Sequence, residues 1–100
     1  MKEIITSVGD KIVKSSLGWQ VSISSIDSMV YQESDKIILF KLEDYPDAMG
    51  ELEWTIYIPV QCRWEGANDQ EMIDQEKLDE IIDRISTAFW KLDMKIKEIA

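Results

Sequence analysis

The sequence contains no histidine, a single cysteine, two prolines and four glycines in 100 residues. Without histidine, the chain lacks the commonest general base and the commonest metal ligand of proteins. Cys62 has no second cysteine to pair with and no histidine to activate its thiol, so we expect neither a disulfide framework nor a thiol nucleophile. We interpret Cys62 as a small buried apolar residue, which is the usual state of an unpaired cysteine.

Motifs for phosphate, calcium or acid–base chemistry are missing too. There is no glycine-rich phosphate-binding loop, and the stretch DYPDAMGE lacks the regular ligand spacing of a calcium-binding loop. Glu51 and Glu53 lie two residues apart, on what we interpret as the water-facing side of a strand, where solvated carboxylates are poor candidates for acid–base catalysis. We therefore expect no catalytic residues, no cofactor and no metal site.

Long hydrophobic segments are also missing. The longest apolar runs, such as Ile37–Phe40, have four residues, whereas a membrane-spanning helix needs about 20. The first residues, MKEIITSVGDKIVKSS, do not contain the continuous apolar stretch of a signal peptide. We expect a single cytoplasmic domain over residues 1–100, because a chain of this length forms one modest core.

Basic residues are scarce, and the resulting negative charge is concentrated in one segment. The net charge is −9, which disfavours nucleic acid and anionic membranes as partners. Residues 1–42 carry five basic and five acidic side chains, residues 43–83 carry two and thirteen, and residues 84–100 carry four and two. An acidic segment often serves only solubility, but the concentration of the excess in residues 43–83 also favours a binding surface for a basic partner.

Hydrophobic spacing predicts the secondary structure of the first half. Apolar residues at positions 4, 5, 8, 12 and 13 follow a helical period and predict an amphipathic helix over residues 2–15. Alternating patterns predict strands at WQVSISSI (19–26), MVYQ (29–32) and IILFKL (37–42), with a polar turn at ESDK (33–36). We expect Ile38, Phe40 and Leu42 to share the buried face of the third strand.

A longer alternation begins at Leu52. The even positions from 52 to 64 are all apolar, which predicts a half-buried strand whose other face, with Glu51, Glu53, Thr55 and Tyr57, meets water. Pro59 cannot donate a ladder hydrogen bond, so it predicts an edge, a bulge or a break, and a break would give a fifth short strand over residues 60–64.

The last third of the chain predicts a long helix. Asn68 and Glu71 have the spacing of a capping box, and apolar residues from Leu78 to Ile99 form one stripe at helical spacing. Lys91, Lys95 and Lys97 would lie near its C-terminus. The predicted fold is α+β: an N-terminal helix, an antiparallel sheet of four or five strands in meander order, and a long C-terminal helix packed on one sheet face.

The stretch EDYPDAMGELEW, residues 43–54, is the strongest candidate for a binding surface. It carries five carboxylates and no Lys, Arg or His. Their repulsion costs stability that a basic partner would offset on binding, and aromatic residues inside a charged rim are typical of interaction sites. The candidate partner-binding residues are Glu43, Asp44, Tyr45, Asp47, Glu51, Glu53, Tyr57, Arg63 and Glu65.

Trp90 and Met94 lie off the apolar stripe of the last helix, one turn apart on its polar side. Cover by a loop or by the N-terminal helix would explain them. A second partner contact or a homodimer seam would also explain them, because exposed aromatic and Met side chains mark interaction sites.

Basic active clefts are typical of enzymes that act on nucleic acid, since these must neutralise phosphates. In size, acidity, α+β layout and exposed aromatics, with EDYPDAMGELEW and CRWEGANDQE as the relevant stretches, the chain resembles the cytoplasmic immunity proteins of bacterial contact-dependent growth inhibition systems. The resemblance implies a one-to-one complex with a cognate basic toxin domain, often a nuclease, whose active site is covered or blocked. We expect a monomer rather than a homodimer when the partner is absent.

Three alternatives stay open. Small acidic type III secretion chaperones are also cytoplasmic and α+β, are usually dimeric, and hold an extended effector segment along apolar grooves; Trp90 and Met94 would serve such a dimer. The other two alternatives are an acidic mimic of nucleic acid and a purely structural subunit.

Overall fold

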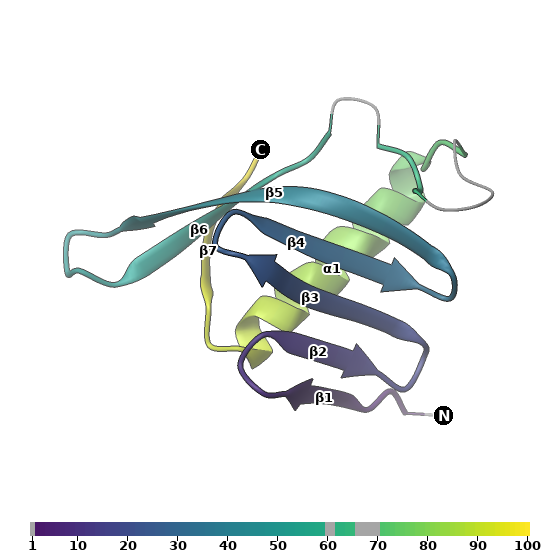
Figure 1. Cartoon of the computed structure of the whole chain (residues 1–100), viewed down its shortest axis with the longest axis horizontal. Coiled ribbons are helices and arrows are strands. Elements are labelled where there is room, and N and C mark those ends of the chain that lie inside the picture. The colour runs from purple at the N-terminus through teal and green to yellow at the C-terminus, as the bar shows by residue number, and fades with distance from the viewer. Residues whose placement is uncertain (1, 60–61, 66–70) are drawn as a thin grey trace.

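The computed structural model describes residues 2–59, 62–65 and 71–100 of the chain. These residues form a curled sheet of seven strands and a helix (Figure 1). The strands are hydrogen-bonded in the order in which they occur along the chain, with β1 to β6 antiparallel and β7 parallel to β6. The elements are β1 (Ile5–Val8), β2 (Ile12–Ser15), β3 (Trp19–Ser25), β4 (Ser28–Glu33), β5 (Lys36–Pro46), β6 (Leu52–Tyr57), α1 (Gln75–Lys91) and β7 (Lys95–Ile99).

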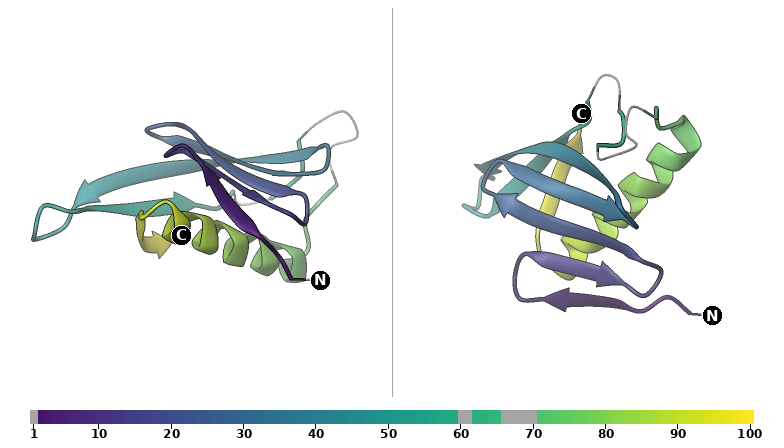
Figure 2. Two further views of the ribbon diagram at one scale, coloured as in Figure 1. Left: turned by 90° about the horizontal axis from the view of Figure 1, so that it is seen from below. Right: turned by 45° about the vertical axis from the view of Figure 1, so that its right-hand side comes forward.

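The helix lies across the concave side of the curled sheet, and the hydrophobic core fills the space between them (Figure 2). Alternate strand residues point to this side, and the apolar stripe of α1 faces them. The sheet contributes Val13, Trp19, Val21, Met29, Tyr31, Ile38, Phe40, Leu42 and Ile56, and α1 contributes Ile81, Ile85, Ala88 and Phe89. In the described part of the chain, no helix combines the length and hydrophobicity needed to cross a membrane.

Residues 5–15 form a β-hairpin, so the helix predicted over residues 2–15 is wrong. β1 and β2 pair antiparallel, with Ile5 opposite Ser15 and Val8 opposite Ile12. Gly9 has a φ of 70° in the turn between them, a conformation that glycine adopts without a steric penalty. The β-branched residues of this segment favour strands, and this preference outweighs the helical spacing of its apolar positions.

The C-terminal helix is shorter than the sequence predicts and is followed by a strand. Asp74 caps its N-terminus by accepting a hydrogen bond from the Lys77 N–H, whereas the predicted cap, Asn68, lies outside the described residues. The helix ends in a Schellman motif: the N–H of Met94 bonds the Phe89 carbonyl, and the N–H of Asp93 bonds the Trp90 carbonyl. Residues 95–99 then pair with β6 as β7.

The predicted antiparallel sheet of four or five strands is therefore wrong in strand number and in the direction of one pair. β6 ends at Tyr57, two residues before Pro59. Residues 60 and 61 of the predicted fifth strand lie outside the described residues, and in segment 62–65 the structure has two isolated bridges, Arg63 with Met72 and Glu65 with Ile37. Thr55, predicted to face water, is buried; β6 is an inner strand there, paired with β5 on one side and β7 on the other. The turn predicted at residues 33–36 is confirmed, and so is the burial of Cys62.

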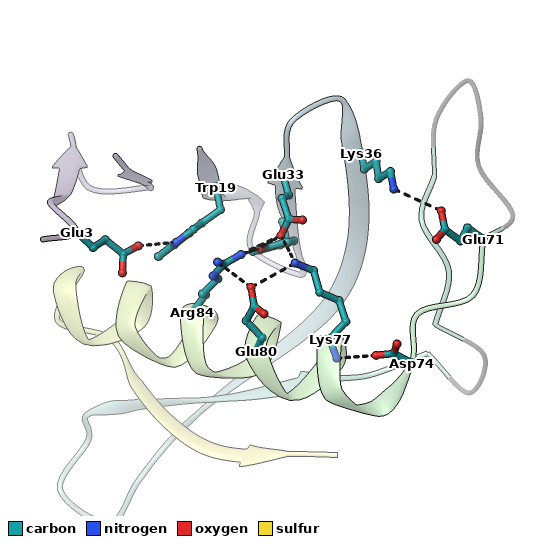
Figure 3. Close-up of polar contacts among 10 residues, drawn as sticks. Glu3, Trp19, Glu33, Lys36, Glu71, Asp74, Lys77, Glu80 and Arg84 are labelled. Carbon is teal, nitrogen blue, oxygen red and sulfur yellow. Dashed lines mark hydrogen bonds and ion pairs between the residues drawn. The ribbon is translucent and has the colours of Figure 1, made fainter. Parts of the chain in front are cut away.

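A polar network fastens α1 to the sheet (Figure 3). One carboxylate oxygen of Glu33 on β4 accepts hydrogen bonds from the Tyr31 hydroxyl, the Arg84 guanidinium and the Lys77 ammonium, each at 2.8 Å. Arg84 also contacts Glu80, at 2.7 Å. Burial works to raise the pKa of Glu33, but the hydrogen bonds from Lys77 and Tyr31 outweigh it and hold the pKa below its usual value.

The lowered pKa of Glu33 predicts part of the pH dependence of folding. Because the folded-state pKa is below the unfolded one, the stabilisation is complete above the unfolded pKa and is lost as the pH falls through the folded pKa. We expect the free energy of unfolding, measured by urea denaturation, to fall below about pH 4.5. It should fall less steeply in Glu33→Gln, and equal pH profiles for the two proteins would contradict this assignment.

Candidate protein-binding site

The acidic stretch EDYPDAMGELEW forms the end of a β-hairpin and not a loop. Residues 43–54, here called the arm, comprise the last residues of β5, a turn and the first residues of β6. Asp44 pairs with Trp54 and Tyr45 with Glu53. The arm projects beyond the body of the domain at the left of Figure 1, along a molecule whose longest dimension is 43 Å.

Asp47 holds the turn of the arm. Its Oδ1 accepts hydrogen bonds from the N–H groups of Met49 and Glu51 at 2.8 and 3.0 Å, an arrangement that Asp favours in turns. These hydrogen bonds hold the pKa of Asp47 below its usual value. Gly50, with a φ of 84°, completes the turn. Asp47 therefore shapes the arm, because its Oδ1 accepts two backbone N–H groups of the turn.

The two faces of the arm carry different chemistry, because residues alternate between faces and paired residues share one. On the convex face, the Tyr45 hydroxyl donates to the Glu43 carboxylate at 2.6 Å. This hydrogen bond, with one from Tyr57, lowers the pKa of Glu43, and the pKa of Tyr45 is raised by the same contact. The opposite face carries Asp44 and Trp54.

Most carboxylates of the arm have no cation to balance them. The Lys95 ammonium on β7 lies 3.8 Å from Asp47 and 3.6 Å from Glu53. Within residues 2–59, 62–65 and 71–100, Glu43, Asp44 and Glu51 form no ion pair with Lys or Arg. The arm therefore keeps an uncompensated negative charge at the most prominent end of the molecule.

A groove of about 670 Å³ lies between the arm and the C-terminal end of α1. Its lining combines apolar and aromatic residues with charged ones, and comprises Glu51, Leu52, Trp54, Trp90, Asp93, Met94 and Lys95. Trp90 is 79% exposed and Leu52 is 50% exposed, whereas Met94 packs partly against the core. The groove brings together two surfaces that were predicted as separate sites. Glu51 belongs to the acidic stretch, and Trp90 and Met94 belong to the predicted second contact or dimer seam.

The structure does not bring Arg63 and Glu65 to the arm. Glu65 bridges to Ile37 near the start of β5, and the nine residues from Ile37 to Tyr45 span roughly 26 Å of strand. The Glu65 carboxylate accepts a hydrogen bond from the Leu39 N–H, and Arg63 bridges to Met72. Both residues lie at the opposite end of β5 from the acidic turn.

Sequence patterns did not single out four residues of the groove. Leu52 and Trp54 fall on the apolar parity of β6 and were expected in the core, but Leu52 is half exposed and Trp54 packs only partly against the core. Lys95 was expected in a helix. The helix was predicted to continue past Asp93, so the position of Asp93 at the end of α1 could not be predicted.

Asp93 is a destabilising residue at the C-terminal end of α1. It occupies the left-handed region with a φ of 59°, at the helix C-terminus where glycine is preferred, and its charge opposes the negative end of the helix dipole. We expect Asp93→Gly to raise the free energy of unfolding by about 0.5–1 kcal/mol in urea denaturation.

Ser34 provides a control for this substitution, because it also has a left-handed φ, 56°, but carries no charge. Ser34→Gly should stabilise less than Asp93→Gly, and Asp93→Asn should retain the part of the gain that comes from removing the charge. A destabilised Asp93→Gly protein would contradict the interpretation of Asp93.

No family model matches this chain, and no curated protein or solved structure matches it significantly. In the portion of the chain that the structure describes, no group of three or more His, Cys, Asp or Glu side chains is arranged to hold a metal ion.

Proposed function

We propose that this protein binds a cation-rich protein through the arm and the adjoining groove. The arm is the main support for the proposal: Glu43, Asp44 and Glu51 form no ion pair in the described residues, and the arm projects from the domain. Glu51 also lines the groove together with exposed Trp90. Uncompensated charge of one sign speeds association with a partner of the opposite sign. Exposed Trp and Tyr side chains supply the buried anchors that such contacts need.

The biological role that fits this surface is that of an immunity protein. We propose that the chain neutralises a cognate cytotoxic domain, a nuclease of the contact-dependent growth inhibition type, by covering its basic active-site region in the cytoplasm. The protein would act as a monomer, without catalysis, cofactor or metal. Nucleic acid and membranes are not its partners in this proposal, since its charge repels both.

The groove favours one alternative function. Exposed Trp90 and Leu52 beside Met94 would suit a chaperone of the type III secretion kind that holds an extended effector segment. Such a chaperone is expected to be dimeric, and binding in its apolar groove should respond weakly to salt. For an electrostatic binder, the association rate constant should fall steeply as ionic strength rises.

The test is to express the protein encoded immediately upstream of this chain's gene, alone and together with this chain, in bacteria. We expect growth arrest with degraded nucleic acid from the upstream protein alone, and normal growth with a one-to-one complex when both are present. An upstream protein that is not toxic, or toxicity unchanged by this chain, would contradict the immunity role. Light scattering on the isolated chain separates the two candidates, because a stable dimer favours the chaperone.

A further inference from the structure

We propose that the groove between the arm and α1 receives an arginine side chain of the partner. This inference rests on the proposed function and specifies what the site recognises. The groove combines two indole rings, Trp54 and Trp90, with carboxylates at Glu51 and Asp93. The groove is open to solvent, and its volume is about 670 Å³.

The aromatic lining favours arginine over lysine. A planar guanidinium stacks on aromatic faces and is weakly hydrated, whereas an ammonium is compact and strongly hydrated. The chain already uses this contact internally: the Arg84 guanidinium lies 5.7 Å from the centre of the Trp19 ring. In the groove, Trp90 is 79% exposed and offers the same kind of surface without a cation of its own chain stacked on it in the described residues.

The charges around the groove favour a cation in it. Glu51 and Asp93 have no ion pair in the described part of the chain, and a carboxylate can accept two parallel hydrogen bonds from a guanidinium. Lys95 also lines the groove, but Asp47 and Glu53 at 3.8 and 3.6 Å balance its charge. Asp93 occupies this position despite the local cost of an acid at a helix C-terminus.

Two hexapeptides of equal charge, hexa-arginine and hexa-lysine, provide the test. Their affinities are measured by titration while the indole N–H signals of the four tryptophans are followed by NMR. We expect both peptides to bind, hexa-arginine roughly five-fold more tightly. Hexa-arginine should shift the signals of Trp54 and Trp90 and leave those of buried Trp19 and Trp64 in place.

Three variants test whether the preference for hexa-arginine over hexa-lysine comes from the groove. Trp90→Ala should abolish the difference between the peptides and leave the affinity for hexa-lysine unchanged, and it should fold normally because the side chain is exposed. Ile26→Ala removes another exposed apolar side chain, 81% exposed in the β3–β4 turn, and should preserve the difference. Asp93→Asn should weaken hexa-arginine binding more than hexa-lysine binding.

The outcomes separate this inference from the proposed function. Equal affinity for the two peptides with no shift at Trp90 would overturn the arginine site and leave a basic partner for the arm intact. No binding of either peptide would overturn both. A homodimer that Trp90→Ala dissociates, with no preference between the peptides, would assign the groove to a second copy of the chain and would also overturn the arginine site.

Discussion

Replacing Asp44 and Glu51 by Lys is expected to slow association with the cationic partner by about ten- to a hundredfold at low salt. Neither carboxylate forms an ion pair in the described residues, so each contributes its full charge to the field at the arm. The association rate constant, measured by stopped-flow tryptophan fluorescence, should also lose most of its dependence on ionic strength. The dissociation rate constant should change less.

The matched control is Asp10→Lys with Asp83→Lys, which changes the net charge by the same amount away from the arm. Asp10 lies in the β1–β2 turn and Asp83 on α1, and both are exposed. We expect this control to slow association only slightly, and both double variants to keep the free energy of unfolding within about 0.5 kcal/mol. Equal slowing by the two double variants would show that only net charge matters, and would contradict a localised site.

Replacing Glu33 by Ala is expected to lower the free energy of unfolding by about 2–3 kcal/mol. The substitution removes the acceptor that Tyr31, Arg84 and Lys77 share. It leaves two partly buried cations of α1 without their partner on β4, with Glu80 as the carboxylate still in contact with both. Their side chains are 20% and 30% exposed, so solvent screens them only in part. Urea denaturation monitored by circular dichroism measures the loss.

Glu71→Ala serves as the comparison. Its ion pair with Lys36, at 3.4 Å, joins side chains that are 66% and 46% exposed. Such a pair contributes little, so we expect a change of less than about 0.5 kcal/mol. Similar losses in the two variants would mean that the Glu33 network does not fasten the helix to the sheet.

The middle strands and the turn at residues 33–36 could be predicted from the sequence, because apolar and polar residues alternate there and the apolar ones are the buried ones. Ile38, Phe40 and Leu42 all point to the core, and each lies two residues from the next. The ends of the chain were mispredicted because their apolar spacing fits two structures. Ile96 and Ile99 fit a helical stripe as well as a strand with a bulge, and only the pairing with β6 decides between them.

The candidate site was predicted in part. Glu43, Asp44, Tyr45 and Glu51 lie on the projecting arm, and Trp90 is exposed. The groove could not be predicted, because it depends on the length of the arm and on where α1 ends. Both follow from tertiary contacts that a local pattern does not contain.

Amide hydrogen exchange on the complex with the cationic partner tests the central claim most directly. We expect slowed exchange over residues 43–54 and around Trp90 on binding, with exchange in β1 and β2 unchanged. Protection confined to the β1–β2 hairpin, with the arm exchanging as it does in the free protein, would contradict the claim.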